Sequence, residues 1–258
     1  MEQSLWDLFW LPPWAEQVDR PELLYTRSAQ DQHALNQVLR VRAGDSAMLP
    51  SLVAEVDQAH RGVTSRWILA RDSQHPDLPA LLLRHGWKPE HRHHVRAAST
   101  ERPAAAAEPD VRVLPVEDTR TLLDCIRVSQ LAFGRKNRRV SEERIADELA
   151  QLTRPRARVH RFVAYDASTG TPMASGGLNT FPDLGVGFLW GGGTIPAYRR
   201  RGAYRGLVAA RMARAAVVGC ELVGVYAREG TSDPIMAALG FSRFGTMLTW
   251  TRSGDHCP

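Results

Sequence analysis

The stretch that most constrains this chain is residues 191–218, which read GGGTIPAYRRRGAYRGLVAARMARAAVV. An apolar run ends at its start, a turn rich in Gly and Arg follows, and an amphipathic pattern completes it. This order predicts a strand, a turn and a helix, which together aim free backbone N–H groups at one point. The helix N-terminus adds about half a positive charge there. The stretch therefore predicts an anion site, of which phosphate is the usual occupant.

Glycine and arginine at the turn fit this interpretation. Gly202 lets the backbone approach a ligand closely, and Arg199, Arg200, Arg201 and Arg205 surround it. The sequence contains no GxxxxGK(S/T), which excludes a P-loop, and no GxGxxG opening a helix, which disfavours a dinucleotide fold. The alternative is a structural turn with a solvated basic face.

The same residues resemble a known signature. Residues 194–212, TIPAYRRRGAYRGLVAARM, resemble that of the GNAT superfamily of acetyl-CoA-dependent N-acetyltransferases. The family pattern is Arg or Gln, two residues, Gly, one residue, then Gly or Ala, at a helix start. Here it reads Arg199, Gly202 and Tyr204, so the last position departs from the family, and the Tyr204 side chain could point away from the turn.

The resemblance extends to the order of elements. Residues 111–251 predict the order β-α-α-β-β-β-α-β-α-β, which is that of the GNAT fold. The family commonly ends its last helix with Leu-Gly-Phe, which matches residues 239–241. We expect strands at 111–114, 159–165, 173–181, 185–195, 222–227 and up to about 250, and helices at 119–133, 141–152, 202–218 and 233–239.

Two units and a linker are expected along the chain. Residues 1–96 form a first unit, 97–110 (AASTERPAAAAEPD) a linker, and 111–252 the GNAT domain. The first unit carries an amphipathic helix near 47–59, a strand at 65–70, a helix at 77–85 capped by Asp77, and a strand at 87–96. An internal echo between residues 70–87 and 227–241 leads to the hypothesis that the first unit is a degenerate GNAT-like half. The expected fold class is α/β (α+β), a mixed central sheet flanked by helices.

The resemblance implies where acetyl-CoA, the cosubstrate, would bind. Its pantetheine chain would pair with the backbone of Gly193, Thr194 and Ile195 as an added strand would. An N–H group near Gly193 or Thr194 would polarise the thioester oxygen. The pyrophosphate would lie on the turn, at Arg200, Arg201, Gly202, Ala203, Tyr204 and Arg205.

Two family positions that usually carry catalysis hold other residues. Trp190 stands where many members have a Glu as base, and Met236 where many have a Tyr as general acid. Three interpretations stay open. The acceptor amine is weakly basic, or Glu229 with Tyr226 beside it serves instead, or the site is not catalytic.

Other polar clusters predict less. His91, His93 and His94 are expected to be a surface cluster, because no Cys or carboxylate completes a metal set. Residues 135–139 (RKNRR) are either an anion-holding loop or a solvated one. We therefore expect no metal.

Composition limits the classes of ligand and the cellular compartment to be expected. The formal net charge is +5 over 258 residues, in scattered groups, which disfavours nucleic acid and favours modest attraction for anions such as CoA. Three cysteines without CxxC spacing indicate a reducing compartment. No signal peptide or apolar run long enough for a membrane span is found, so a cytoplasmic protein is expected.

The function expected from all this is transfer of acetyl from acetyl-CoA to a primary amine, by direct attack in a ternary complex. The acceptor is expected to be a small molecule, and a homodimer is one alternative for the assembly. The alternative function is a catalytically silent acyl-CoA-binding regulatory or sensor protein.

Overall fold

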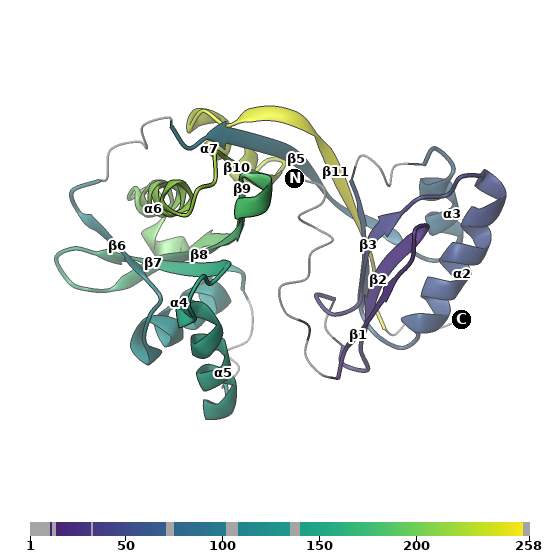
Figure 1. Cartoon of the computed structure of the whole chain (residues 1–258), viewed down its shortest axis with the longest axis horizontal. Helices are drawn as coiled ribbons and strands as arrows, with labels where there is room; N and C mark the ends of the chain where they lie inside the picture. Colours follow the sequence, from purple (N-terminus) through teal and green to yellow (C-terminus); the bar gives the residue numbers. More distant parts are fainter. Residues whose placement is uncertain are drawn as a thin grey trace. The chain divides into compact units, whose positions relative to one another are not determined.

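The computed structural model describes residues 11, 14–31, 33–70, 75–101, 108–134 and 140–254 (Figure 1). The chain divides into two packing units. The first unit comprises Met1–Val95, Ala227–Ile235 and Arg243–Pro258, and the second comprises Arg96–Tyr226 and Met236–Ser242. Residues 135–139 and Cys257, considered above, lie outside the described residues.

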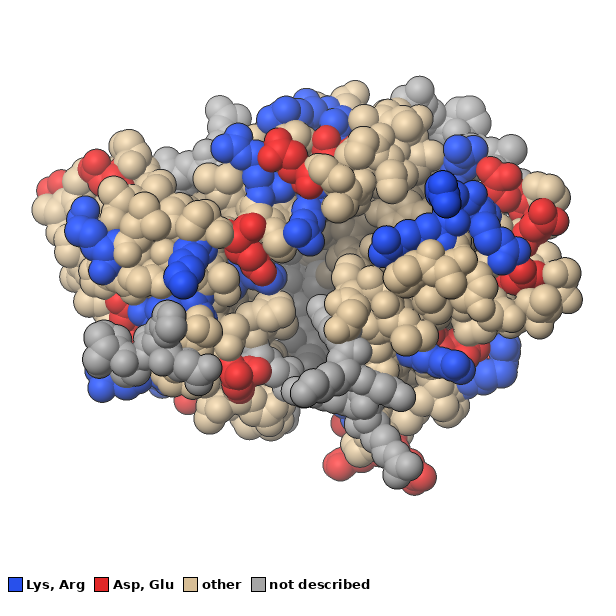
Figure 2. Space-filling view, turned by 180° about the vertical axis from the view of Figure 1, so that it is seen from behind, with Lys and Arg blue, Asp and Glu red and all other residues tan. Residues whose placement is uncertain are grey.

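Charges are mixed on the surface. On the face shown in Figure 2, Lys and Arg side chains alternate with Asp and Glu rather than forming one continuous basic area. The described surface also carries ion pairs, for example Arg20 with Glu55 at 2.6 Å and Arg27 with Glu16 at 2.5 Å. A clustered basic face, typical of nucleic-acid binding, is therefore not seen on this side. Among the described helices, none has the length and apolar character needed to cross a membrane.

The first unit is a mixed sheet covered by two helices. Its strand order is β1-β2-β3-β4-β11-β5, in which β3 and β4 run parallel and the pairs β1–β2, β2–β3 and β4–β11 run antiparallel. The elements are β1 (Glu16–Asp19), β2 (Leu23–Arg27), β3 (Gln37–Val41), α2 (Leu49–Ala59), β4 (Ser65–Leu69), α3 (Leu78–Arg84), β5 (Lys88–Ser99) and β11 (Ser242–Arg252).

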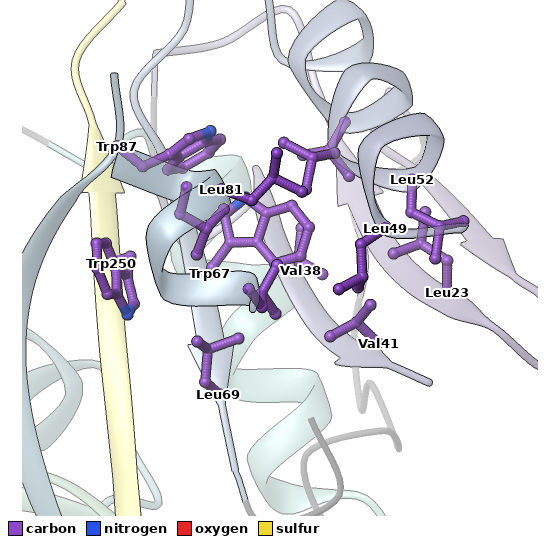
Figure 3. Close-up of a cluster of buried hydrophobic side chains, with 14 of the residues drawn as sticks. Leu23, Val38, Val41, Leu49, Leu52, Trp67, Leu69, Leu81, Trp87 and Trp250 are labelled. Atoms are coloured by element: carbon purple, nitrogen blue, oxygen red, sulfur yellow. The ribbon is translucent and has the colours of Figure 1, made fainter. Parts of the chain in front are cut away.

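A single apolar core holds the first unit together. Trp67 and Trp87 are 0% and 1% exposed and meet edge to face, with ring centroids 5.9 Å apart. Leucines and valines of α2, α3 and the strands surround them (Figure 3). Buried aromatic pairs of this geometry add about 0.5–1.5 kcal/mol beyond the area they bury.

The strand-helix-strand expected over residues 65–96 is confirmed, as β4, α3 and β5. Asp77 lies at the N-cap of α3, but the expected capping bond is absent, because its backbone is helical (φ −85°, ψ −17°) rather than extended. Its carboxylate accepts a hydrogen bond from Ser46 Oγ at 3.0 Å instead.

The second unit is also a mixed sheet, with helices on both faces. Its strand order is β10-β9-β8-β7-β6, in which β9 and β10 are parallel. Figure 1 shows α4 and α5 on one face of β6–β9 and α6 on the other. The elements are β6 (Val111–Pro115), α4 (Thr119–Ala132), α5 (Glu142–Thr153), β7 (Val159–Asp166), β8 (Pro172–Phe181), β9 (Val186–Thr194), α6 (Ala203–Val217), β10 (Leu222–Arg228) and α7 (Ser232–Ala238).

Local chemistry explains where these helices begin and how they are held. Asp118 accepts from the Thr121 backbone N–H at 2.7 Å and completes a capping box at the start of α4. Ser141 caps α5 through the Arg144 backbone N–H. Helix α6 presents Leu207, which is fully buried against β6, β7 and β8. The order of elements expected from residue 111 onward is present.

The packing units do not follow the chain order. Strand β11 belongs to the first unit from Arg243, since it pairs with β4 from Leu248↔Leu69 to Arg252↔Ser65. Arg252 also donates to Asp57 of α2 at 2.6 Å. The expected linker at 97–110 begins later, because residues 97–99 continue β5, and residues 102–107 lie outside the described ones. The boundaries 1–96 and 111–252 stay a proposal, and the structure adds that β11, from the end of the chain, packs in the first unit.

A buried histidine makes the stability of the first unit depend on pH. His60 is 1% exposed, and its Nε2 lies 2.7 Å from the Thr26 carbonyl oxygen. Burial lowers the pKa of His60 to about 4. The unfolded chain binds the proton between pH 6.5 and 4 while the folded chain does not. The free energy of unfolding is therefore at its full value above pH 6.5 and falls by up to about 3 kcal/mol as the pH drops towards 4.

We predict that His60→Gln, which keeps a donor for Thr26, removes this part of the acid destabilisation. Urea unfolding at several pH values between 7 and 4 measures it. A wild-type slope in His60→Gln would contradict the assignment.

Candidate functional site: a bulged strand beside a helix N-terminus

Strand β9 carries a β-bulge. Its register with β8 is regular up to Trp190, shifts, and resumes at Gly193. Gly191 and Gly192 together oppose one residue of β8, and Gly191 takes the left-handed conformation, with φ +57°. Bulges bend a strand and redirect its side chains. The sheet is therefore interrupted at this point.

The bulge changes which face each glycine presents. A Cβ built on Gly192 would lie 3.0 Å from the Tyr204 ring of α6. A Cβ built on Gly193 would lie 2.9 Å from Ala132 of α4. A side chain at position 193 would therefore force a shift at α4, and one at position 192 would need the Tyr204 ring to move by a few tenths of an ångström.

One edge of β9 opens next to the bulge. The parallel register with β10 runs from Val186↔Leu222 to Leu189↔Val225 and ends there among the described residues. The other edge stays bonded to β8, and Ile195 N–H donates to the Met173 carbonyl at 2.9 Å. The backbone predicted to pair with pantetheine, at residues 193–195, thus follows directly after the point where β9 and β10 stop pairing.

The turn after β9 gathers the six residues predicted for the pyrophosphate. Arg200 and Gly202 both have positive φ, +65° and +77°, a conformation that is uncommon for a non-glycine residue. Gly202 is the N-cap of α6 and offers no side-chain cap. The first N–H groups of the helix have no partners within it, which is the local geometry that favours an anion.

Two carboxylates already lie against this turn. Arg201 pairs with Asp166 at 2.6 Å. Hydrogen bonds from Ser168 first, and then from Arg201, hold the pKa of Asp166 well below its usual range. Glu108 pairs with Arg205 at 3.2 Å. A Cβ built on Gly202 would lie only 2.1 Å from Glu108 Cγ. A side chain of the chain itself therefore covers the helix start.

The α4 face beside the bulge is aromatic. Trp190 lies flat over Gly177, where an added Cβ would come 2.2 Å from the indole ring. Its Nε1 donates to Asn179 Oδ1 at 2.7 Å. The Arg161 guanidinium lies 5.2 Å from the indole centre and is paired with Glu148. The carboxylate nearest to Trp190 in these contacts is therefore already neutralised.

The remaining predicted catalytic residues fall in different units. Tyr226 is half-buried in the second unit, and its ring centroid lies 4.8 Å from that of Phe188. Glu229 belongs to the first unit. Its carboxylate is about half exposed and lies 3.4 Å from His94 Nε2, and its N–H donates to the Arg92 carbonyl.

The histidines do not all lie on the surface as expected. His94 is 7% exposed, and its Nδ1 lies 2.9 Å from Asp233 Oδ2. Burial lowers the pKa of His93 to about 4. The expectation of a surface cluster was wrong because α7 covers His94 through Asp233. Among the described residues, no group of His, Cys, Asp or Glu has an arrangement suited to a metal ion.

The α6 face contains a feature that sequence analysis missed. Arg211 is 1% exposed, and its guanidinium lies beneath the bulge. The Tyr204 side chain reaches the same place, with its hydroxyl 4.0 Å from Met236 Sδ. The available signal was the position of Arg211 between Leu207 and Ala215, at helical spacing on the buried stripe. A charged residue on such a stripe marks a polar group facing the interior.

We predict that Gly177→Ala displaces the Trp190 ring. Overpacking of this kind costs about 1–3 kcal/mol, so the free energy of unfolding should fall by that amount and the tryptophan emission should change. Gly245→Ala is the control, since its Cβ would lie 3.8 Å from Val95, an ordinary contact. Equal stability of the two variants would contradict this position of Trp190.

Comparisons with known proteins bear on the fold. No protein-family model and no curated protein matches the chain. Solved structures do. A GCN5-related N-acetyltransferase from Kribbella flavida aligns with a TM-score of 0.66 at 19% identity, over 93% of this chain and 90% of its own.

Two further structures agree. A tandem GNAT protein from the clavulanic acid biosynthesis pathway aligns with a TM-score of 0.62 at 14% identity, over 96% of this chain and 86% of its own. A GCN5-related N-acetyltransferase from Sphaerobacter thermophilus aligns with a TM-score of 0.61 at 15% identity, over 91% of this chain and 82% of its own. At these identities the likeness concerns the fold, and it confirms the expectation from sequence: the chain has a two-half GNAT fold.

Proposed function

We propose that the second unit is an acetyl-CoA-dependent N-acetyltransferase. The observation that carries the proposal is one local arrangement, in which an open strand edge after the bulge leads into a left-handed turn and a helix N-terminus. An extended chain ending in phosphates fits this arrangement, because the edge offers strand-like hydrogen bonds and the helix start offers N–H groups. The acetyl ester of coenzyme A is such a molecule.

Each part of the cofactor has a stated partner in this proposal. Gly193, Thr194 and Ile195 pair with pantetheine, and an N–H group at the first two polarises the thioester oxygen. The turn and first helical residues hold the pyrophosphate, where each charge-assisted hydrogen bond contributes about 1.5–3 kcal/mol. Those residues are Arg200, Arg201, Gly202, Ala203, Tyr204 and Arg205.

Glu108 must leave the turn when a phosphate binds. Its side chain lies against Gly202 and its carboxylate pairs with Arg205, so it competes with the pyrophosphate for the Arg205 charge. Because the Glu108 side chain is 40% exposed, it can turn away from Gly202 into solvent. The carboxylate thus stands in for the anion that the site is built to bind.

The acceptor is proposed to be a small molecule with a weakly basic primary amine. At pH 7, deprotonating an amine of pKa about 10.4 costs about 4.6 kcal/mol, whereas one of pKa about 8 costs about 1.4 kcal/mol. Trp190 supplies no base, and Glu148 is neutralised by Arg161. The aromatic rings of Phe188, Trp190 and Tyr226 offer an apolar wall to the acceptor, which attacks the thioester directly in a ternary complex.

Glu229 and Tyr226 stay candidates for the base and its neighbour. Glu229 is about half exposed, and its carboxylate lies beside His94. Their roles are part of the proposal, as is a cytoplasmic location, which two free buried cysteines, Cys125 and Cys220, fit. A homodimer is compatible with it.

One observation favours a second candidate function. In the contacts described around Trp190, no unpaired carboxylate replaces the missing base. A protein that binds acyl-CoA and reports its level without turnover would need no base. Release of CoA that depends on an added amine separates the enzyme from this sensor.

We predict that acetyl-CoA at about 100 times its dissociation constant raises the free energy of unfolding by about 2.7 kcal/mol, an increase of several degrees in Tm. Gly202→Asp should abolish the shift, because it adds charge at the helix start. Gly219→Asp is the matched control, at the other end of α6 with φ +86° and no atom near its Cβ. It should keep the shift.

Glu108→Gln should have the opposite effect on stabilisation by acetyl-CoA. It removes the competing carboxylate, so the shift at a fixed subsaturating acetyl-CoA concentration should grow, while Glu101→Gln should match the wild type. No shift in the wild type at any concentration would contradict the proposed function.

A further inference from the structure

A buried cation, Arg211, lies beneath the bulge, and no carboxylate of the described residues pairs with it. The Arg211 Nε donates to the Leu207 carbonyl at 3.0 Å, and Nη1 donates to the Gly177 carbonyl at 3.2 Å. Nη2 has no hydrogen-bond partner among the described residues. Burial lowers the pKa of Arg211, and the nearby Tyr204 hydroxyl counteracts this. A buried charge with an unsatisfied donor is costly, so its position calls for a functional reason.

The free nitrogen and a phenol converge on one point. A Cβ built on Gly192 would lie 3.2 Å from the Tyr204 hydroxyl oxygen and 3.4 Å from Arg211 Nη2. Tyr204 is half-buried, and its ring starts in the first turn of α6. The hydroxyl therefore joins the helix start, where the proposed pyrophosphate lies, to the bulge, where β9 and β10 stop pairing.

Two sequence departures meet here. Tyr204 stands at the signature position of Gly or Ala, and the Tyr204 hydroxyl lies 4.0 Å from the Sδ of Met236, which is fully buried. Met236 offers no proton. The phenol that is absent at position 236 is thus present on α6, directed to the same place.

We infer that Tyr204 is the general acid for the leaving thiolate of this site and that Arg211 is the positioning residue that stabilises its anion. The inference rests on the proposed function. As the amine nitrogen bonds to the acetyl carbon, the carbon–sulfur bond breaks and its electron pair goes to sulfur. The Tyr204 O–H proton passes to that sulfur, giving CoA as a thiol, and the phenolate is held by Arg211 until it takes a proton from water. The acceptor nitrogen loses its own proton to solvent or to a base.

Charge development explains the cost of burying Arg211. A donor fixed in a dry site acts most strongly on charge that appears only during reaction. Arg211 Nη2 is fixed by two bonds to backbone carbonyls through the same guanidinium. A purely structural Arg211 would satisfy those carbonyls but would not need Tyr204 to be a phenol rather than a phenyl ring.

The test uses binding of the product, so that it needs no acceptor. If Tyr204 and Arg211 favour a thiolate, the bound thiol of CoA has a lower pKa than the free thiol, and CoA affinity rises with pH. Calorimetric titration of the full chain with CoA and with desulfo-CoA, from pH 7 to 9.5, isolates the contribution of sulfur. We expect the ratio of the two dissociation constants to change by about tenfold, which is one pKa unit.

Tyr204→Phe should reduce that change to less than about threefold, and any loss of affinity common to CoA and desulfo-CoA cancels in the ratio. The double variant Tyr204→Phe/Met236→Tyr, which places a phenol on α7 instead, should restore part of the pH-dependent change in the ratio. Tyr198→Phe is the matched control, a half-buried tyrosine in the same turn whose ring lies 5.9 Å from the Arg201 guanidinium. It should behave like the wild type.

The outcomes separate the two proposals. A ratio that does not change with pH in the wild type, or that changes equally in Tyr204→Phe, overturns the assignment of Tyr204 while leaving cofactor binding intact. Failure of both CoA and desulfo-CoA to bind the wild type at every pH overturns the proposed function and this inference with it.

Discussion

The bulge at Gly191 and Gly192 is the constraint on which the second unit depends. It lies where β9 stops pairing with β10, and it reverses which residues face α4 and which face α6. Without the extra residue, Gly192 would face α4, and its Cα would no longer face Tyr204 and Arg211. Three consecutive glycines make this arrangement possible, since Gly191 has positive φ and a Cβ at either of the next two positions would crowd its neighbours.

The arginines around this bulge have distinct roles that their shared sequence run conceals. Arg201 is fixed by Asp166, and Arg205 holds Glu108 over the helix start. Arg211 is buried, and its Nη2 has no hydrogen-bond partner among the residues that the structure describes. In the proposed site the backbone, rather than the arginine side chains, therefore presents the main anion contacts, with the positive end of α6 behind them. The proposal gives the arginine side chains control of access to the phosphate and of the charge beneath the bulge.

Much of the second unit was predictable because its signals are local. Periodicity and caps such as Asp118 placed the elements from β6 to β11 within a few residues. Strands β1, β2 and β3 were missed, as short segments whose pairing is long-range. The place of β11 in the first unit depends on its pairing with β4, which no local pattern encodes. The positions of Tyr204 and Arg211 relative to β9 depend on the bulge, because a register shift decides which face each residue meets.

Hydrogen–deuterium exchange of the whole protein, with and without CoA, tests most directly whether the bulged edge and the helix start form one cofactor site. The account predicts that amides of residues 192–195 and 200–205 gain protection together, because pantetheine bonds the first group and phosphate the second. Amides of β2 and β3, in the first unit, should not change. Protection confined to the first unit, or absent from both segments at saturating CoA, would contradict it.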